Sequence, residues 1–110
     1  MKDIKKFINL PALIKSFEEF KSSKPFNHCV CDNFFKVQFA KQLSNEFPNY
    51  NTKNFWHEYD NAIEVKKTCN DWNKFQLNTY KIFSLFNSNE FSSLLSKLSK
   101  IKILNPDYGL

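Results

Sequence analysis

Two short clusters hold the residue types that most often perform chemistry, and the first could bind a metal. His28, Cys29 and Cys31 lie within four positions of one another, and imidazole and thiolate groups are common zinc ligands. A zinc site, however, normally has at least two residues between its paired thiolates and a second ligand pair elsewhere in the chain. On an extended strand, His28 would also point away from both cysteines. We therefore interpret this cluster as structural, and the distant Cys69 does not change that interpretation.

The second cluster combines an imidazole with two carboxylates and could support general acid–base catalysis. His57, Glu58 and Asp60 flank Tyr59, but proton transfer needs a pocket and a positioned substrate as well as suitable groups. Residues this close in sequence more often form a polar strand edge or a loop, and we favour that interpretation. The sequence thus assigns no catalytic, cofactor-binding or metal-binding residue. Its single glycine also excludes phosphate-binding loops and dinucleotide fingerprints, which need several glycines.

Basic charge and aromatic residues raise the question of nucleic-acid binding. The formal net charge is +5, all 16 basic residues are lysines, and Trp56, Tyr59, Trp72 and Phe75 could stack on bases. The lysines are dispersed along the chain, and arginine, whose planar guanidinium suits phosphate, is missing. Aromatic residues of this kind more often close a small core. We therefore expect a solvated basic surface and no specific nucleic-acid partner.

The hydrophobic spacing predicts mostly helices with a minority of strand. Apolar residues recur every three or four positions over 7–20, which predicts a helix that ends before Pro25. A short strand is expected over 26–31, and Asp32 is expected to cap a helix that stops at Pro48. The apolar stripe of that second helix is Phe35, Phe39, Leu43 and Phe47.

The second half of the chain predicts two extended segments followed by two helices. Residues 55–59 and 62–68 are expected to be extended, and a helix is expected from Leu77. In the last helix, Asn87 is expected to be the cap and Glu90 its partner in a capping box. The first of these helices places Tyr80, Phe83 and Phe86 on one side. The last one buries Phe91, Leu94, Leu95, Leu98 and Ile101 and leaves Ser92, Lys97 and Lys100 outside.

Length and composition limit the chain to one domain at most, with a modest core. It has 110 residues, of which 42% are hydrophobic, including 13 Phe. No run approaches the roughly 20 apolar residues of a membrane span, and the N-terminus lacks the apolar region of a secretory signal. We therefore expect no membrane partner and a location in the cytoplasm. The odd number of cysteines then indicates free thiols.

A resemblance to a known family emerges from the order of several short motifs. Residues 25–35, Pro-Phe-Asn-His-Cys-Val-Cys-Asp-Asn-Phe-Phe, are similar to the entry strand and helix start of prolyl 4-hydroxylase-like iron(II)/2-oxoglutarate oxygenases. A helix ending in Glu-Phe-Pro follows in that family, and Glu46-Phe47-Pro48 stands here. Gln76-Leu77 replaces a proline-containing turn, and residues 1–24 carry no family signal. The later matches are Trp56, Tyr59, Asn61, residues 64–67, Asn70-Asp71-Trp72, residues 86–91 and residues 101–110.

The resemblance implies an α+β fold, with a helix-rich N-terminal support layer and one or two short strands of a double-stranded β-helix, or jelly roll. Residues 1–24 would be an N-terminal helical extension, and residues 25–110 the N-terminal portion of an oxygenase-like domain. In the family, a His-x-Asp pair and a later His bind iron(II) and leave positions open for 2-oxoglutarate and oxygen. His28 and His57 are the only histidines here, and neither is followed two residues later by Asp. No ligand of iron(II) or 2-oxoglutarate is therefore carried over, although the intact domain would use both.

The resemblance also implies a dioxygenase whose catalytic residues lie outside this sequence. The chain ends in a turn signal, Pro106-Asp107-Tyr108-Gly109. We expect the domain to be interrupted there and to be inactive alone as a hydroxylase, with its substrate unidentified. Apolar helix faces that lack their sheet would be exposed and would favour self-association. The alternative function is a small helical binding module for a protein or nucleic-acid partner.

Overall fold

The computed structural model describes residues 2–102, 104 and 105, and this part of the chain combines helices with a small sheet. The two strands form one antiparallel hairpin. At this general level, the structure agrees with the predicted α+β class. The elements are α1 (Lys2–Phe7), α2 (Leu10–Ser16), the 3₁₀ turn η1 (Phe17–Glu19), α3 (Val37–Glu46), β1 (His57–Asp60), β2 (Val65–Thr68), the 3₁₀ turn η2 (Trp72–Lys74), α4 (Leu77–Phe86) and α5 (Asn89–Ser99).

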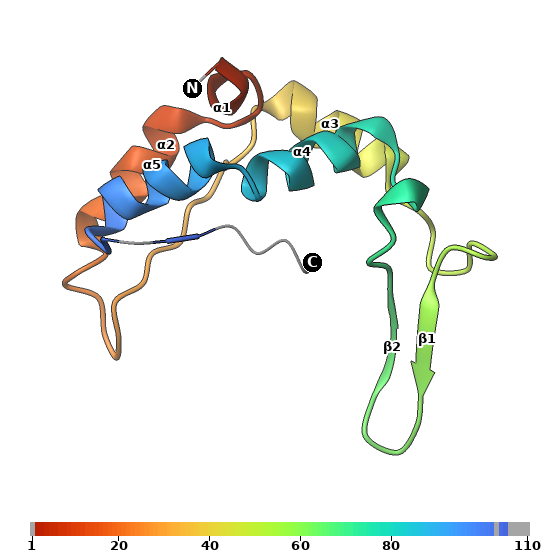
Figure 1. The fold of residues 1–110 in the computed structure, drawn as a ribbon. Helices are drawn as coiled ribbons and strands as arrows, with labels where there is room; N and C mark the ends of the chain where they lie inside the picture. Colours follow the sequence, from red (N-terminus) through yellow and green to blue (C-terminus); the bar gives the residue numbers. More distant parts are fainter. Residues whose placement is uncertain (1, 103, 106–110) are drawn as a thin grey trace.

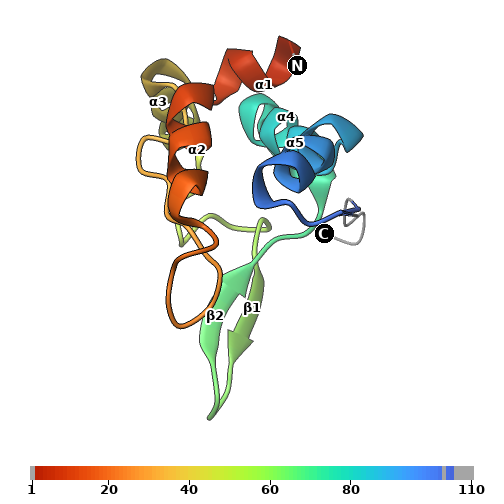
Figure 2. The ribbon, with the colours of Figure 1, turned by 90° about the vertical axis from the view of Figure 1, so that its left-hand side faces the viewer.

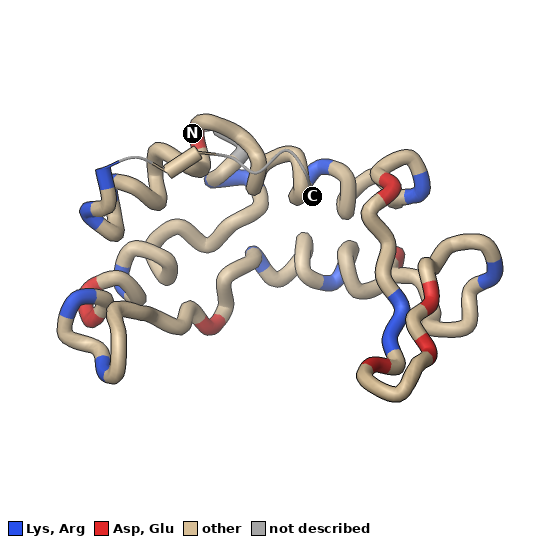
Figure 3. Tube along the Cα trace, turned by 60° about the horizontal axis from the view of Figure 1, so that its bottom comes forward, with Lys and Arg blue, Asp and Glu red and all other residues tan. Residues whose placement is uncertain are grey.

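The helices form two rows that pack against each other. In Figures 1 and 3, α2 and α3 follow one another in one row, and α4 and α5 follow one another in the second. The short helix α1 bridges the two rows, as Figure 2 shows from the side. The loop between α2 and α3 and the β hairpin both extend from the same side of this helical layer (Figure 1).

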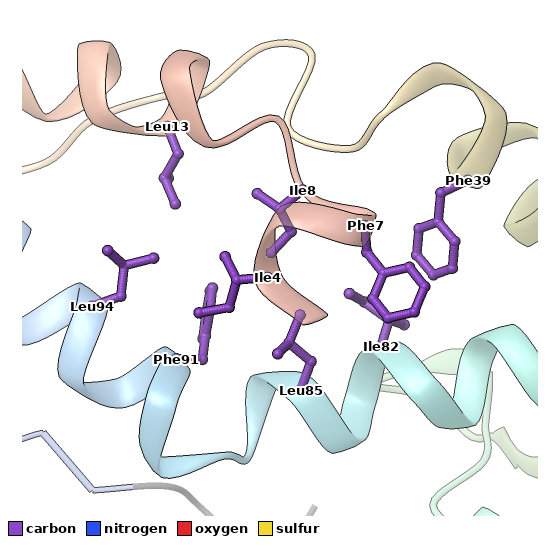
Figure 4. Packing of buried hydrophobic residues seen from close by; sticks show 9 residues of the cluster. All are labelled: Ile4, Phe7, Ile8, Leu13, Phe39, Ile82, Leu85, Phe91 and Leu94. Atoms are coloured by element: carbon purple, nitrogen blue, oxygen red, sulfur yellow. The ribbon is translucent and has the colours of Figure 1, made fainter. Parts of the chain in front are cut away.

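The core lies between the two rows, and α1 with the residue after it supplies its centre. Ile4 and Ile8 are fully buried, and Figure 4 shows their side chains at the centre of the cluster, with Leu13 and Leu94 on one side and Phe7 on the other. Residues of the segment 1–24 and of the segment 25–110 therefore share one core. The complete buried set is Ile4, Phe7, Ile8, Leu13, Phe39, Ile82, Leu85, Phe91 and Leu94.

The single helix predicted over 7–20 is wrong, because the chain leaves the helical path after Phe7. Pro11 has no N–H, and in a continuous helix its ring would collide with the carbonyl four residues earlier, that of Phe7. That carbonyl instead accepts a hydrogen bond from the Lys36 N–H at 3.0 Å. Asn9 then caps α2 through its side-chain oxygen. The sequence Asn9-Leu10-Pro11 indicates this second helix start, because Asn is a favoured cap and Pro is tolerated in the first turn of a helix.

The strand predicted over 26–31 is also wrong, and α3 begins later than the predicted cap at Asp32. A strand needs a partner for its backbone groups, and this segment pairs with no other strand in the described chain. Phe35, which follows this segment, forms an isolated antiparallel bridge with Ile8. Lys36 then occupies the N-cap position of α3. The predicted end of this helix, before Pro48, is confirmed within two residues.

The apolar stripes predicted for the helices are only partly buried. In α3, Phe39 is buried, whereas Phe35 precedes the helix and Phe47 follows it with 65% of its surface exposed. In α4, Ile82 and Leu85 are buried, and of the predicted side Phe86 packs partly against the core whereas Tyr80 is exposed. In α5, Leu94 is buried, while Leu95 and Leu98 pack partly against the core.

The capping box predicted at the start of α5 is wrong by one residue. The hydroxyl of Ser88 accepts a hydrogen bond from the Phe91 N–H at 3.1 Å, so Ser88 rather than Asn87 is the cap. Ser92, predicted to lie outside, is buried because its hydroxyl donates to the Ser88 carbonyl at 3.1 Å. Bonding back to the preceding turn satisfies the hydroxyl without water.

The predicted end of the last helix is wrong as well. Lys100 adopts φ 65°, the left-handed conformation typical of a helix terminus, and the helix ends before Ile101. Ile101, predicted to complete the buried stripe, is 47% exposed. The turn predicted at 106–109 lies outside the described residues.

The hairpin confirms the two later strands, although both are shorter than predicted and β1 ends one residue later, at Asp60. Both strands are largely exposed, and the four pairs of residues run from His57–Thr68 to Asp60–Val65. The turn between them is closed by the Asn61 side chain, which accepts the N–H groups of Ile63 and Glu64 at 2.8 and 3.0 Å. This local bonding is the reason that Asn is favoured in turns.

We predict that the centre of the core determines the stability of the two helix rows. Ile4→Ala should reduce the free energy of unfolding by about 2–5 kcal/mol, because it leaves a cavity at a fully buried position. Ile63, at the hairpin turn, is 93% exposed, and Ile63→Ala should cost less than about 0.5 kcal/mol. Urea unfolding followed by circular dichroism measures both. Equal losses in the two variants would contradict this description of the core.

Candidate functional site: an aromatic junction at the base of the hairpin

The histidine and cysteines of the first sequence cluster make local contacts. The His28 Nδ1 atom lies 2.8 Å from the Phe26 carbonyl oxygen, and the Ser16 hydroxyl lies 3.9 Å from Cys29 Sγ. Cys29, Cys31 and Cys69 are free thiols. Across the described residues, no group of three or more His, Cys, Asp and Glu side chains is placed to hold a metal ion.

The residues of the second cluster lie along β1, where all four positions are exposed. The ring centroids of His57 and Tyr59 are 4.7 Å apart, so this imidazole packs on the strand surface. The Glu64 carboxylate, just before β2, forms an ion pair with the Lys66 ammonium at 2.9 Å, and this contact raises the pKa of Lys66. The shift favours a charge that lysine already carries at neutral pH. It therefore does not produce a catalytic base.

The most extensive side-chain cluster outside the core lies where the hairpin meets the helices. We call it the aromatic junction. Phe75 lies between Trp72 and Phe83, with ring centroids 6.0 and 5.4 Å away. Phe83 in turn lies 6.2 Å from Phe86, which packs 5.3 Å from the core residue Phe91. Aromatic contacts thus run from the hairpin base into the core. The junction comprises Phe47, Phe55, Trp56, Trp72, Phe75 and Phe83.

The aromatic junction surrounds a small apolar cavity. Its volume is about 220 Å³, below the roughly 300–1,000 Å³ of typical small-molecule sites. A space of this size accommodates one apolar side chain rather than a cofactor. Five junction residues line it, Phe47, Phe55, Trp56, Phe75 and Phe83, together with Pro48, Cys69, Gln76 and Thr79.

A carboxylate clamp beside this cavity joins the two helix rows. Glu46, the last residue of α3, accepts hydrogen bonds from the backbone N–H and the hydroxyl of Thr79, the latter at 2.9 Å. The amide of Asn78 donates to the same carboxylate at 3.3 Å. These donors belong to the first turn of α4, where unpaired N–H groups and the helix dipole favour negative charge. Sequence analysis missed this role because the cap comes from a residue more than thirty positions away.

Several residues of the oxygenase-like motifs therefore have structural roles in or near the junction. Glu46 is the clamp, and Phe47 packs against Trp56 with ring centroids 6.0 Å apart. Asp71 caps η2 by accepting the Asn73 N–H at 3.0 Å. Of the aromatic residues weighed as base-stacking groups, Trp56, Trp72 and Phe75 all belong to this cluster.

Lys67 ties the hairpin to the loop that precedes it. Its ammonium donates to the Tyr50 carbonyl at 2.8 Å, lies 4.1 Å from the Tyr50 ring centroid, and is 3.3 Å from Glu58. On the same loop, the Trp56 indole N–H donates to the Asn49 carbonyl at 2.8 Å. These bonds fix the hairpin at its base, although its strands remain exposed.

A larger hollow between α1 and the α4–α5 row has a polar lining but no convergent set of unused groups. Its volume is about 550 Å³, and Lys6, Lys81 and Glu90 all contribute to it, so both signs of charge are present. The Ser88 hydroxyl in its wall already donates to the Leu85 carbonyl at 2.6 Å and serves as the α5 cap. The hollow therefore lacks the few aligned polar groups that define a ligand site.

The charged residues are spread over the described surface with the signs mixed. Figure 3 shows lysines distributed along the length of the chain trace, with acidic residues among them. A nucleic-acid site would require a basic face or stripe, and the visible distribution does not provide one in this view.

Comparison of the chain with protein-family models, with curated proteins and with solved structures found no match. Among the described helices, none combines the length and the apolar character needed to cross a membrane. The location in the cytoplasm stays a prediction.

We predict that the Glu46 clamp contributes to the packing of α3 against α4. Glu46→Ala should lower the free energy of unfolding by about 1–3 kcal/mol, because it leaves partly buried donors at the start of α4 without their acceptor. Glu46→Gln should lose less, since the amide oxygen can still accept. The control is Glu18→Ala, an exposed carboxylate whose loss should change stability by less than about 0.5 kcal/mol. Identical urea midpoints for Glu46→Ala and Glu18→Ala would refute the clamp.

We predict weak and non-specific binding to nucleic acid, because the positive charge is modest and dispersed. Fluorescence anisotropy at physiological salt should give dissociation constants no tighter than about 1 μM, the range of non-specific complexes. The comparison is between two labelled oligonucleotides of equal length and unrelated sequence. Tighter binding to one of them would contradict the prediction.

Proposed function

We propose that this chain forms the helical support layer of a prolyl 4-hydroxylase-like iron(II)/2-oxoglutarate oxygenase, a dioxygenase of the jelly-roll type. In this role the helices do not perform chemistry. They bury one side of the layer in their own core and pack the other side against the sheet that carries the active site. The proposal rests on the order of the sequence motifs together with the distribution of exposed apolar side chains.

The observation that carries the proposal is the exposure of large apolar side chains in and beside the two segments that extend from the helical layer, the loop and the hairpin. Phe26 and Val30, in the loop, are 68% and 76% exposed, and Phe47, in the aromatic junction, is 65% exposed. Single exposed apolar residues are ordinary, but groups of them mark surfaces that pack against something else. The loop between α2 and α3 and the β hairpin extend from the same side of the helical layer (Figure 1). In the proposed enzyme, the sheet packs against this side, between the two segments.

The iron(II) centre of such an enzyme does not fit the residues of this chain. Neither histidine has an Asp two residues later, and both have the local contacts described above. We therefore assign no ligand of iron(II) or 2-oxoglutarate to this chain and derive no catalytic step from it. Within the proposed function, the chemistry belongs to residues that this sequence does not contain.

We predict that the chain alone does not convert 2-oxoglutarate to succinate. The reason is the missing His-x-Asp motif, since three protein ligands are needed to hold iron(II) with positions open for the cosubstrate. The assay contains iron(II), ascorbate and 2-oxoglutarate, and succinate is followed against a blank without iron. Succinate formation that is lost in both His28→Ala and His57→Ala would overturn the prediction.

The family assignment itself is tested on the gene. The reading frames downstream of the Leu110 codon should encode a Gly-rich loop followed by His-x-Asp and a later His. If no such remnant is present in any frame, the support-layer function fails, and the alternative of a small helical binding module takes its place.

A further inference from the structure

The two strands of the hairpin each have an edge that pairs with no third strand in the described chain. The Asn61 N–H donates to the Glu64 carbonyl at 3.0 Å and closes the ladder. Hydrogen-bonded and non-bonded pairs alternate along an antiparallel ladder. The pairs Asp60–Val65 and Glu58–Lys67 therefore turn their backbone N–H and carbonyl groups outward, toward the two open edges.

The two edges carry opposite charge. The outward-bonding positions on β1 are the acidic residues Glu58 and Asp60, whereas those on β2 are Val65 and the basic residue Lys67. Figure 3 shows this separation as acidic residues on one strand of the hairpin and basic residues on the other. Within one hairpin the arrangement already forms an ion pair, with Lys67 Nζ 3.3 Å from Glu58 Oε1.

We propose that the hairpin pairs with the hairpin of a second copy of this chain, with β1 of one copy beside β2 of the next. This arrangement repeats the register found within one hairpin and sets Glu58 opposite Lys67 of the neighbouring copy. Opposite charges across neighbouring strands stabilise pairing, and like charges directly opposite destabilise it. The pairing satisfies the outward backbone groups, which are otherwise available to any extended segment.

The charges also select against the two symmetric alternatives. A two-fold pairing of β1 with β1 sets Glu58 opposite Asp60 of the second copy, so four carboxylates meet. A two-fold pairing of β2 with β2 sets Lys66 directly opposite Lys66. The favoured contact is therefore heterologous, which means that it does not close at a dimer and can add further copies.

Salt dependence separates this contact from association through the exposed apolar helix faces, which the sequence predicts. Ion pairs between exposed strands weaken as salt screens them, whereas hydrophobic contacts are kept or strengthened by salts such as sulfate. Sedimentation equilibrium should show an average mass that grows with concentration beyond a dimer at low salt and returns toward the monomer at about 0.5 M NaCl.

Val65→Pro tests the contact most directly. It removes an outward N–H at the first residue of β2 and leaves the hydrogen bonds between β1 and β2 in place. It should weaken association about tenfold, the equivalent of one lost hydrogen bond. The matched control is Val37→Pro, which replaces another exposed valine at the first position of α3, where proline is tolerated. This control should associate as the unmodified chain does.

Asp60→Lys gives a second measurement that does not depend on proline in a strand. It removes a carboxylate from the β1 edge and should weaken association at low salt, while circular dichroism stays unchanged. A chain that is monomeric at every concentration would overturn the proposal. So would association that persists at high salt and is unaffected by Val65→Pro, since the apolar helix faces would then be the contact. Neither outcome bears on the oxygenase-like function, which the downstream gene sequence tests.

Discussion

The packing of α1 against both helix rows is the constraint on which the rest of the structure depends. Ile4 and Ile8 are completely buried between the rows, and burying such a side chain is worth about 1.5–3 kcal/mol. That is a large fraction of the roughly 5–15 kcal/mol that stabilises a typical domain. A helix of six residues is not stable in isolation. Helix α1 and the two rows therefore stabilise one another.

A second constraint sets the geometry of the hairpin end of the molecule. The Glu46 carboxylate joins the end of α3 to the start of α4, and the aromatic junction packs next to this clamp. Lys67 and Trp56 then fix the hairpin through bonds to backbone carbonyls of the preceding loop. The hairpin is therefore attached at its base while its strands remain exposed. This arrangement is compatible with the proposed support layer.

The motif residues that suggested the oxygenase family act here as caps and packing residues. Glu46 caps a helix across the molecule, Asp71 caps a 3₁₀ turn, and Asn61 closes the hairpin. These roles explain why such residue types occur at these positions without any chemistry at the site. They are also compatible with the proposed support layer, in which the helices hold the sheet and other residues bind iron(II).

Sequence alone determined the features that depend on neighbouring residues. The start of α4, the end of α3 near Pro48 and the two later strands followed from apolar spacing and turn residues, because those signals act within a few positions. The Asn9 and Pro11 signal was also local, but the longer apolar periodicity over 7–20 obscured it. The absence of a His-x-Asp motif is likewise a property of the sequence itself.

Tertiary structure decided the features that need a distant partner. The segment 26–31 has strand-like alternation but no strand beside it, and the carbonyl of Phe7 bonds to Lys36 rather than within a helix. Which side of α4 is buried depended on where α1 packs, and the acceptor for its first N–H groups came from Glu46. Polar backbone and side-chain groups form hydrogen bonds with the partners that lie near them in the folded chain. The spacing of residues along the sequence does not determine which distant partner that is.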